Sequence, residues 1–586
     1  MSLSKRKTPF LGLLLSLLAY PAFADSLGRP PNIVLLLADD VALMDFGVYG
    51  GEAQTPNIDR LAKNGTIFTN YHASPMCAPS RAMLLTGYDS HLTGVPNLPL
   101  FLPPEYTEKP TYKGTLNNTV KTVATYLKEI GYETYMTGKW HLGHDSTNLP
   151  SKRGFDRTFI LDASGADNYE HKAYLPTQGK PPWFEDGRPV DLPKDFYSSK
   201  NLVDKMIEFM DADHQANRPF FSFISFQAIH IPVQVPRKFT EKYIETYRDG
   251  WEKIREKRIK NAKNLGLFPH QAPVGAMLPV LPKWEDLSEE AQKLSAKSMA
   301  VNAGMLEAMD FHLGRYIDYL KKEDLFDNTI FIITSDNGPE GSQPSQVPSM
   351  EIWMQWAGYH RDYDRLGEKG SFTSIGPQFA SAASGPNAYF KFYAGEGGLR
   401  VPLIMAGPTI PPGVKKAFSF VTDITPTLLD LSQVGSSTIS SNQFSGKSLL
   451  PVINGTKTDI YTPDEPVGME AAKQAALFKG DYKLAYVGKP YGDGVWRLYN
   501  LTIDPGETKD LAESKPKLFQ EMMADYEAYK AEVGVLEMPE DYETLKEVTA
   551  KLRRKISIVA IPLIVGLLLA LIGWWISRNM RKPQLN

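Results

Sequence analysis

The sequence predicts an α/β fold in which helices sandwich a large, mostly parallel mixed sheet, followed by a small α+β subdomain. In the run NIVLLL at 32–37 every residue after Asn32 is apolar, which is typical of a fully buried central strand, and acidic residues follow it at 39–40. Further strand-like segments alternate with helical patterns, which is typical of a mostly parallel sheet covered on both faces. After about Pro426 the pattern changes to short strands separated by turns such as 492–494, GDG.

Individual elements follow from local spacing. Over 119–130 apolar residues recur at helical intervals, and Gly131 follows where a helix would end. Similar patterns predict helices over 57–64, 299–321 and 516–532. Strands are expected at 133–137, 220–226, 329–334, 476–478, 482–486 and 497–500.

A length of 586 residues allows one large domain and a smaller one. We expect the main α/β domain over 25–425 and the C-terminal α+β subdomain over 426–538. Within the main domain, 339–390 is rich in Gly, Ser, Pro and aromatic residues and lacks clean periodicity. This segment is predicted to be a long excursion from the sheet, and loops of that length are usually functional or disordered.

The first residues have the pattern of a secretory signal peptide. A basic stretch at 5–7 precedes an apolar run at 10–19, and Ala22-Phe23-Ala24 offers a cleavage site. The alternative is a short membrane anchor, for which the apolar run is too short. We therefore expect residues 1–24 to be removed on export.

The opposite end is predicted to cross a membrane. The stretch 556–576 carries no charge and is long enough, as a helix, to span about 30 Å of hydrocarbon. Trp574 and Trp575 lie at one end, where indole rings favour the interface. The sequence thus predicts a charged stalk over 539–555, a transmembrane helix over 556–577 and a short basic tail over 578–586. Together with export, this places the protein on the periplasmic or extracytoplasmic face, anchored in membrane lipid by its C-terminal helix.

Composition restricts the possible partners and chemistry. The net charge is −3 and no basic stripe is interleaved with aromatics, so we expect no nucleic-acid partner. Cys77 is the only cysteine, so an exported chain would lack an intramolecular disulfide. A lone thiol acts as a small buried hydrophobe or is retained for chemistry, and composition leaves both interpretations open.

Polar residues follow two of the predicted strands. Asp39 and Asp40 come after the run at 32–37, and Asp336 and Asn337 follow the strand at 329–334. In open α/β sheets ligands bind at the carboxyl ends of strands. Each pair is by itself an ordinary turn sequence. Together these side chains form an oxygen-only ligand set that suits a hard divalent cation and argues against zinc.

Cys77 lies in the sequence PMCAPSR at 75–81. Pro79 fits the first turn of a helix, which places Cys77 at the helix N-terminus. Free N–H groups and the helix dipole favour an anion there, and Arg81 adds a positive charge. The segment therefore suits a sulfate or phosphate oxyanion.

These motifs resemble those of the sulfatase family, within the alkaline phosphatase superfamily. The run Cys-x-Pro-Ser-Arg, with LLTG at 84–87 behind it, resembles the formylglycine motif. The segment GYETYMTGKWH at 131–141 resembles the second family motif, with Thr137 as a mild departure. Segments 31–40, 336–338, 396–402 and 498–507 also match in the expected order. The resemblance covers roughly residues 30–530 and is greatest to the larger bacterial arylsulfatases.

The resemblance implies a fold like that of alkaline phosphatase and a specific set of site residues. One calcium ion would be held by Asp39, Asp40, Asp336, Asn337 and residue 77. A formylglycine-generating maturation enzyme would convert Cys77 into formylglycine (3-oxoalanine). The residues implied to surround the sulfate are Arg81, Lys139, His141, His230 and Lys391.

The resemblance also implies a mechanism for a sulfuric-ester hydrolase acting on a small-molecule sulfate ester. One hydroxyl of the hydrated aldehyde attacks sulfur and forms a covalent sulfo-enzyme. The cations and the metal neutralise the oxygens of the transferring group. His230 or Lys391 protonates the departing alcohol. His141 takes a proton from the second hydroxyl, and sulfate leaves.

Two alternatives remain at this point. One is a phosphonate or phosphate ester hydrolase of the same superfamily. The other is a membrane-tethered binder of sulfated glycans whose cysteine is never converted. The aromatic residues of the excursion would either line a leaving-group pocket or form a local core; they are Trp353, Trp356, Tyr359, Tyr389, Phe392 and Tyr393.

Overall fold

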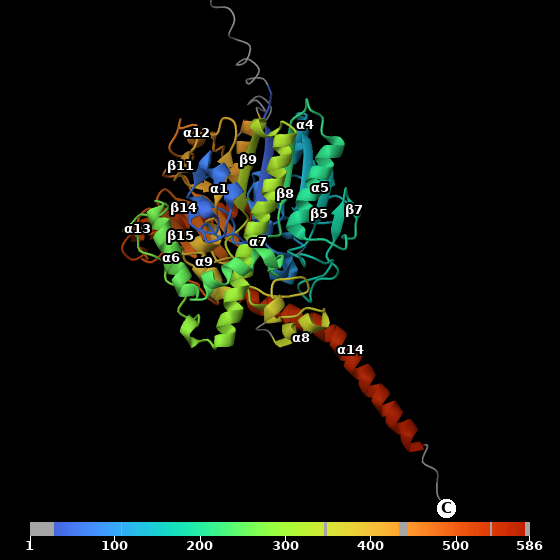
Figure 1. Cartoon of the computed structure of the whole chain (residues 1–586). Helices are drawn as coiled ribbons and strands as arrows, with labels where there is room; N and C mark the ends of the chain where they lie inside the picture. Colours follow the sequence, from blue (N-terminus) through green and yellow to red (C-terminus); the bar gives the residue numbers. More distant parts are fainter. Residues whose placement is uncertain (1–28, 107, 345–347, 433–442, 540–541, 581–586) are drawn as a thin grey trace, which may run out of the picture.

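The structure is a computed structural model that describes residues 29–580, apart from 107, 345–347, 433–442 and 540–541. The predicted signal peptide at 1–24 lies outside the described residues, as does the end of the predicted basic tail. The described residues form one large mixed sheet, a small antiparallel sheet and helices around both (Figure 1).

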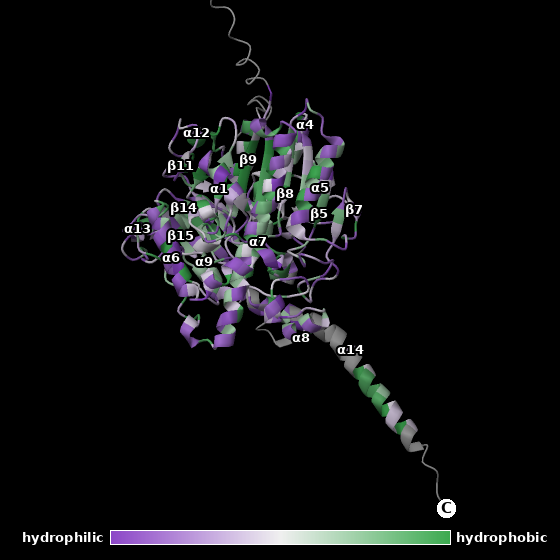
Figure 2. Cartoon of the chain, viewed as in Figure 1, coloured by the Kyte–Doolittle hydropathy of each residue, from purple (hydrophilic) through white to green (hydrophobic). Residues whose placement is uncertain are grey.

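The large sheet has the strand order β11-β2-β10-β9-β1-β8-β4-β5-β6-β7. Its four central strands, β9, β1, β8 and β4, are parallel, and antiparallel pairs occur nearer the edges. Figure 2 shows that the central strands are strongly hydrophobic, as strands covered on both faces must be. The predicted large mixed sheet is confirmed. Its strands are β1 (Asn32–Ala38), β2 (Thr66–Phe68), β4 (Glu133–Lys139), β5 (Arg157–Leu161), β6 (Trp183–Glu185), β7 (Arg188–Pro189), β8 (Phe220–Ser225), β9 (Thr329–Ser335), β10 (Leu403–Ala406) and β11 (Gly413–Lys415).

The register of the central strands brings their carboxyl ends level. Ala38 at the end of β1 pairs with Ser335 at the end of β9, and Leu37 pairs with Ser225 at the end of β8. On the other side of β8, Gly138 of β4 also pairs with Ser225. The residues that follow these four strands therefore reach the same edge of the sheet.

The helices form two groups. In the first, α1 and α5 both contact α7, and these helices lie in front of the sheet in Figure 1. In the second, α2 and α4 both contact α11. The helices are α1 (Pro56–Lys63), α2 (Cys77–Thr86), α3 (Ser90–Thr93), α4 (Val123–Glu129), α5 (Ser198–Asp213), α6 (Trp251–Asn264), α7 (Glu289–Lys322), α8 (Pro348–Trp356), α9 (Gly376–Ala383), α10 (Glu396–Leu399), α11 (Ile424–Leu431), α12 (Leu450–Ile453), α13 (Pro516–Val533) and α14 (Thr544–Met580).

Two helices begin at places that differ from the prediction. Helix α4 begins at Val123 rather than 119, because the Thr122 hydroxyl accepts from the Thr125 N–H and caps the helix there. Helix α7 begins ten residues before the predicted start at 299. Its first turns are polar and largely exposed, so they carry no apolar periodicity, and Ser288 caps them.

The excursion at 339–390 is folded. It contains α8 and α9, and its residues Met354, Tyr359 and Phe372 form a buried cluster with Tyr174 and Ile231 of the main domain. The aromatic residues thus contribute mainly to local packing. Trp356 is the exception, with 84% of its surface exposed.

The C-terminal region contains a four-stranded antiparallel sheet, β13-β14-β15-β16, within the predicted subdomain. Met522 and Tyr526 of α13 pack against its buried residues Leu477, Leu484 and Leu498. The four strands are β13 (Val467–Ala471), β14 (Gln474–Lys479), β15 (Tyr482–Tyr486) and β16 (Trp496–Asn500), and a separate pair joins β3 (Tyr71–His72) to β12 (Ser419–Phe420).

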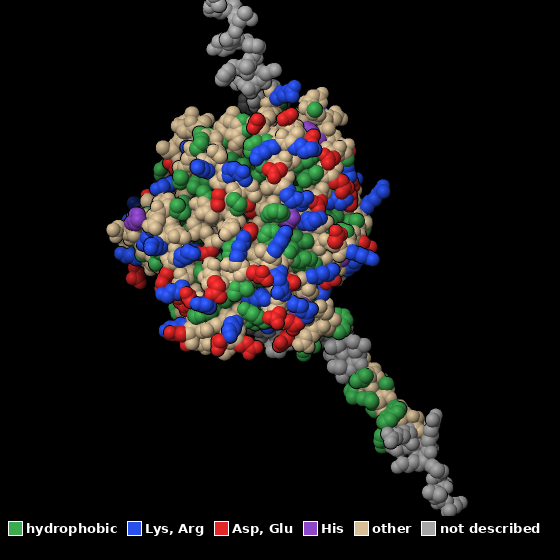
Figure 3. All heavy atoms as spheres, viewed as in Figure 1, with side chains coloured by type: hydrophobic (Ala, Val, Ile, Leu, Met, Phe, Trp, Pro, Cys, Tyr) green, Lys and Arg blue, Asp and Glu red, His purple; other side chains and the backbone are tan. Residues whose placement is uncertain are grey.

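The predicted membrane span lies within α14, which extends away from the body of the protein (Figure 1). Several side chains between 555 and 564 lie outside the described set. Within the part of the chain that is described, no helix meets the length and apolarity needed to cross a membrane. The transmembrane prediction is thus not confirmed. The described end of α14 nevertheless exposes apolar side chains such as Leu567 and Trp575 (Figures 2 and 3).

A buried histidine links the main domain to the small sheet. His91 of α3 lies between the carboxylates of Asp89, 3.0 Å from Nδ1, and Glu470 of β13, 3.1 Å from Nε2. Burial opposes a charge on this ring, but hydrogen bonds to both carboxylates outweigh burial and raise the His91 pKa to about 9. The protonated ring therefore stabilises the contact between the two parts.

We expect His91→Gln to lower the free energy of unfolding by about 3 kcal/mol at pH 6, given the pKa difference from the unfolded chain. Because the folded-state pKa is the higher one, this stabilisation is complete below about pH 6.5 and is lost as pH rises through about 9. Denaturant unfolding of wild type and variant between pH 6 and 9.5 measures it. An equal difference at both ends of this range would contradict the assignment.

Candidate active site

The ligand candidates meet at the carboxyl edge of the central strands. Asp39 and Asp40 follow β1, and Asp336 and Asn337 follow β9; all four are buried. The Asn337 amide donates to Asp40 Oδ1 at 2.7 Å, and the Asp40 N–H donates to Asp336 Oδ1 at 3.2 Å. The two strand ends therefore form one cluster, as the sequence predicts.

Cys77 is the first residue of α2, as predicted, and it is 1% exposed. Its Sγ lies 3.4 Å from Nδ1 of His141, which follows β4. Helix α2 thus points its N-terminus, with its free N–H groups, at the edge of the sheet where the carboxylates lie.

Arg81, one turn further along α2, fixes this helix to the sheet. Its Nε donates to Asp336 Oδ2 at 2.9 Å, and its Nη2 lies 2.7 Å from the same oxygen in an ion pair. Its Nη1 donates to the Lys139 carbonyl at 2.9 Å and to the Ser225 hydroxyl at 2.6 Å. A planar guanidinium can make these bonds in three directions at once, which a lysine cannot.

Two lysines complete the cluster. Lys139 Nζ, at the end of β4, lies 2.6 Å from Asp39 Oδ2. Lys391 Nζ, at the end of the excursion, lies 2.7 Å from Asp40 Oδ1 and 2.9 Å from Glu340 Oε2. His230 lies next to them, with Nε2 4.0 Å from Asp40 Oδ2. The structure therefore brings together all the residues that the sequence assigns to the site.

Three oxygen atoms in this cluster have no hydrogen-bond partner among the described residues. They are Asp39 Oδ1, Asp40 Oδ2 and Asn337 Oδ1, and all are buried. Buried acceptors without partners are costly and call for an explanation. Asp39, Asp40 and His230 also offer ligand atoms that lie within 4.8 Å of one another. The residues present thus fit a divalent cation.

Burial and neighbouring charges set the protonation states. Burial raises the pKa of the Cys77 thiol although Lys139 and Lys391 oppose this. Burial, reinforced by Lys139, holds the pKa of His141 well below its usual value, and burial with Lys391 does the same for His230. Burial opposes the charge on Lys391, but Asp40 and Glu340 outweigh it and hold its pKa well above the usual value. At neutral pH the thiol is protonated, both imidazoles are neutral and Lys391 is a cation.

The backbone is constrained at the same place. Asp40 has φ 69°, His141 φ 61° and Phe392 φ 73°, a region that non-glycine residues rarely adopt. At Gly338 a Cβ atom would lie 1.9 Å from the Gly397 carbonyl oxygen. Glycine is required in this turn so that the strand end can approach α10 closely.

Two residues of the cluster were not predicted from sequence. Ser225 carries no motif signal, and it receives its role from the pairing of β8 with β4. Glu340 lies three residues after Asn337, at the start of the excursion. The Lys391 N–H donates to the Pro339 carbonyl at 3.1 Å, so the two ends of the excursion meet beside the site. Only this closure brings Glu340 to Lys391.

Comparison with known proteins identifies the family. A family model described as Sulfatase matches residues 31–434. The chain belongs to the sulfatase family. It hydrolyses sulfuric esters, and the phosphate-ester alternative is not favoured.

Individual relatives agree with this assignment. An uncharacterised sulfatase of Schizosaccharomyces pombe is 35% identical over 88% of this chain and 96% of its own length. An arylsulfatase of Klebsiella aerogenes is 32% identical over 72% of this chain and 90% of its own length. A solved sulfatase from Pseudoalteromonas sp. shares the fold, with a TM-score of 0.56 and 21% identity over 89% of this chain and 92% of that one.

The partnerless oxygens predict a measurable cation effect. At a hundredfold excess over Kd, Ca²⁺ should stabilise the wild-type chain against unfolding by about 2.7 kcal/mol, and a chelator should reverse this. Asn337→Ala removes one partnerless oxygen and should strongly reduce the shift. Thermal unfolding with and without Ca²⁺ measures it.

Asn302→Ala is the matched control, because Asn302 is a buried asparagine of α7 outside the site. It should keep the full Ca²⁺ shift. An unchanged shift in Asn337→Ala would show that the cation binds elsewhere.

Proposed function

We propose that this sulfatase cleaves sulfate monoesters at the carboxyl edge of β9, β1, β8 and β4, with residue 77 as the nucleophile after its conversion to formylglycine. Asp39, Asp40, Asp336 and Asn337 hold one divalent cation. The observation that supports this most directly is the set of partnerless buried oxygens beside the N-terminus of α2, where Cys77 begins the helix.

The state of the thiol favours conversion. A cysteine acts as a nucleophile in its thiolate form, which a lowered pKa provides. Burial instead raises the pKa of Cys77, so the unmodified residue is a poor nucleophile. When present, hydrated formylglycine supplies a hydroxyl for attack and a second one for release of sulfate. His141 is neutral, and its Nδ1 lies 3.4 Å from Sγ, so it is placed to accept a proton from residue 77.

The ligand set favours calcium. Its members are carboxylate and amide oxygens, which hard cations prefer. The ion would supply positive charge to polarise a sulfate oxygen. Without it, four buried carboxylates (Asp39, Asp40, Asp336 and Glu340) face only three permanent cations. A divalent ion gives the site a net positive charge, which suits an anionic substrate.

The chain's own cations bind and orient the sulfate. Arg81, Lys139 and Lys391 converge on the cluster, and each is held in place by a carboxylate. For the departing alcohol, the two candidate proton donors differ. His230 is neutral, and its Nδ1 lies 2.6 Å from the Ile231 carbonyl oxygen. The single N–H of the neutral ring donates to this carbonyl, so no proton remains for the leaving group. Lys391 carries its protons at neutral pH. We therefore assign the donation to Lys391.

The substrate is an ester with an apolar or aromatic leaving group. Phe392 directly follows Lys391 and contacts the Phe101 ring at 5.4 Å. The ring of Tyr174 lies edge-on to His230 at 5.3 Å. Phe392 and Tyr174 thus lie beside residues of the site, and Tyr174 also belongs to the buried cluster that contains Tyr359. The arylsulfatase of Klebsiella aerogenes supports the same class of leaving group.

We expect Cys77→Ser to lower kcat for an aryl sulfate by roughly 10³-fold or more, because serine has no second hydroxyl with which to release sulfate. Mass spectrometry of the wild-type peptide containing residue 77 should show sulfur replaced by oxygen with loss of two hydrogens. Circular dichroism checks that the variant is folded. Wild-type turnover by Cys77→Ser would overturn the nucleophile assignment.

The same proposal includes export and anchoring. The support for it is the signal-like sequence at 1–24, the uncharged run at 556–576 and the exposed apolar side chains along α14. The catalytic edge of the sheet would then be in an extracytoplasmic compartment, close to the membrane that holds α14.

In a Gram-negative host the full chain should sediment with membranes and resist alkaline extraction. A chain ending at residue 543 should be released into the periplasm with its kcat unchanged, because the residues of the site all precede this point. Fractionation with an activity assay measures both. Recovery of the full chain in the soluble fraction would contradict anchoring.

A further inference from the structure

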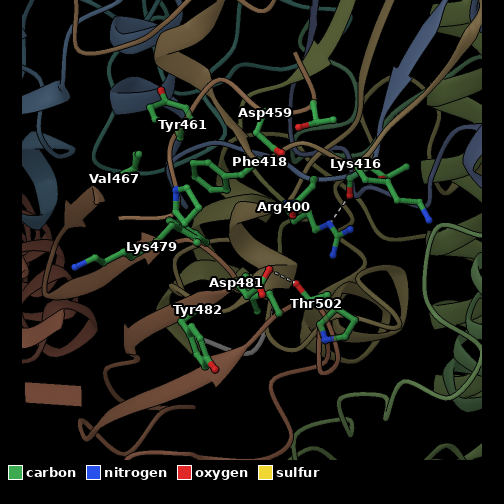
Figure 4. A pocket seen from close by; sticks show the side chains of 18 of the residues that line it. Arg400, Lys416, Phe418, Asp459, Tyr461, Val467, Lys479, Asp481, Tyr482 and Thr502 are labelled. Carbon is green, nitrogen blue, oxygen red and sulfur yellow. Dashed lines mark hydrogen bonds between the residues drawn. The ribbon is translucent and has the colours of Figure 1, made fainter. Parts of the chain in front are cut away.

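One large cavity of the described structure lies away from the catalytic site. It has a volume of about 840 Å³ and lies between the main domain and the small sheet (Figure 4). Loop residues after α6, the segment around β12 and the β14–β15 turn line it. None of its lining residues belongs to the catalytic cluster. Its size is within the range of sites for small organic ligands.

Arg400 is the unusual residue of this cavity. It follows α10, and only 6% of its surface is exposed. Its Nε donates to the Thr69 carbonyl at 2.6 Å, and its guanidinium lies 4.8 Å from the centre of the Phe268 ring. Among the described residues, the closest acid to Nη1 is Glu396, at 4.0 Å, beyond hydrogen-bond distance.

Glu396 is already occupied by other partners. Its carboxylate lies 2.8 Å from Lys483 Nζ and 3.0 Å from His72 Nε2. The N–H groups on the two terminal nitrogens of Arg400 therefore have no protein acceptor in the described structure. Arg400 lines the cavity, so these N–H groups are open to a solute there. Planar guanidinium N–H groups match the geometry of an oxyanion.

The other residues that line the cavity indicate the chemistry of the rest of the ligand. Phe418, Tyr461 and Tyr482 present aromatic rings (Figure 4). Asp459 and Asp481 add carboxylate acceptors, and Thr502 adds a hydroxyl group. The Thr502 hydroxyl donates a hydrogen bond of 2.7 Å to Asp481. The carboxylates disfavour a ligand with several negative charges. They suit a ligand that carries several hydroxyl groups.

We propose that this cavity is a second, non-catalytic binding site for a saccharide that carries a single oxyanion, either a sulfate ester or a carboxylate. The oxyanion binds the terminal N–H groups of Arg400, a ring face packs on the aromatic wall, and hydroxyl groups bond to Asp459 and Asp481. Lys416 lies at the rim and adds positive charge. This proposal does not depend on the chemistry proposed for residue 77.

Isothermal titration calorimetry on the full chain tests it, in a Cys77→Ala, Lys391→Ala background that disables the catalytic site. The probes are glucose 6-sulfate, glucuronate, glucose and inorganic sulfate. We expect one molecule of glucose 6-sulfate or glucuronate to bind per chain. Its affinity should exceed that of glucose and of inorganic sulfate about tenfold or more.

Arg400→Met should reduce the affinity for both anionic sugars about a hundredfold, and Arg400→Lys by less, because a single ammonium replaces the planar donors. Thr462→Trp fills the cavity from an exposed lining position and should abolish binding even if the arginine variants fail to fold. Thr456→Trp is the matched control, because Thr456 is exposed in the same loop but does not line the cavity.

Three results would overturn the proposal. They are no binding by either anionic sugar, equal binding of glucose or of inorganic sulfate, and an unchanged affinity in Thr462→Trp. Loss of binding in Thr456→Trp would also count against it, because the effect would then not come from the cavity. Failure of the residue-77 chemistry would leave all these outcomes unaffected.

Discussion

Charge neutralisation inside the fold is the constraint on which the rest of this structure depends. Four carboxylates and three cations meet where water is excluded, and each cation touches at least one carboxylate. Breaking one buried pair leaves an uncompensated charge and is strongly destabilising. The strands, α2 and the excursion must therefore all be packed together in the folded protein, because each supplies charges that neutralise those of the others.

Parallel strand pairing brings these charged residues together although each lies in only a short polar sequence. Because β9, β1, β8 and β4 end level, the short polar sequences that follow them lie side by side. Even the short Asp and Asn side chains can therefore meet. This is why Asp39, Asp40, Asp336 and Asn337 could be predicted as one cluster from the strand patterns. Lys139 and His141 needed the family resemblance as well, since nothing in their local spacing distinguishes them from ordinary polar residues.

The features that sequence did not predict depend on contacts between distant segments. Glu340 acquires its partner only because the excursion closes, and Ser225 only through the register of β8 with β4. The polar start of α7 has no apolar stripe to reveal it. Two matching motifs, 396–402 and 498–507, meet each other, since Glu396 and Glu507 share Lys483. The first motif also packs against the Gly338 turn beside the catalytic cluster. Their match thus reflects how the small sheet is attached next to the site.

The closure of the excursion has a consequence for how such a protein can diversify. A backbone hydrogen bond joins Lys391 to Pro339, and an ion pair joins Lys391 to Glu340. The residues between Glu340 and Lys391 therefore form a loop whose two ends are held together. Lengthening a loop that is already closed costs little additional entropy. The segment can therefore gain, lose or exchange residues while the strand ends keep their positions. Recombination could replace the excursion while the catalytic cluster stays unchanged. Substrates with other leaving groups could then be accepted without a change in the fold of the sheet.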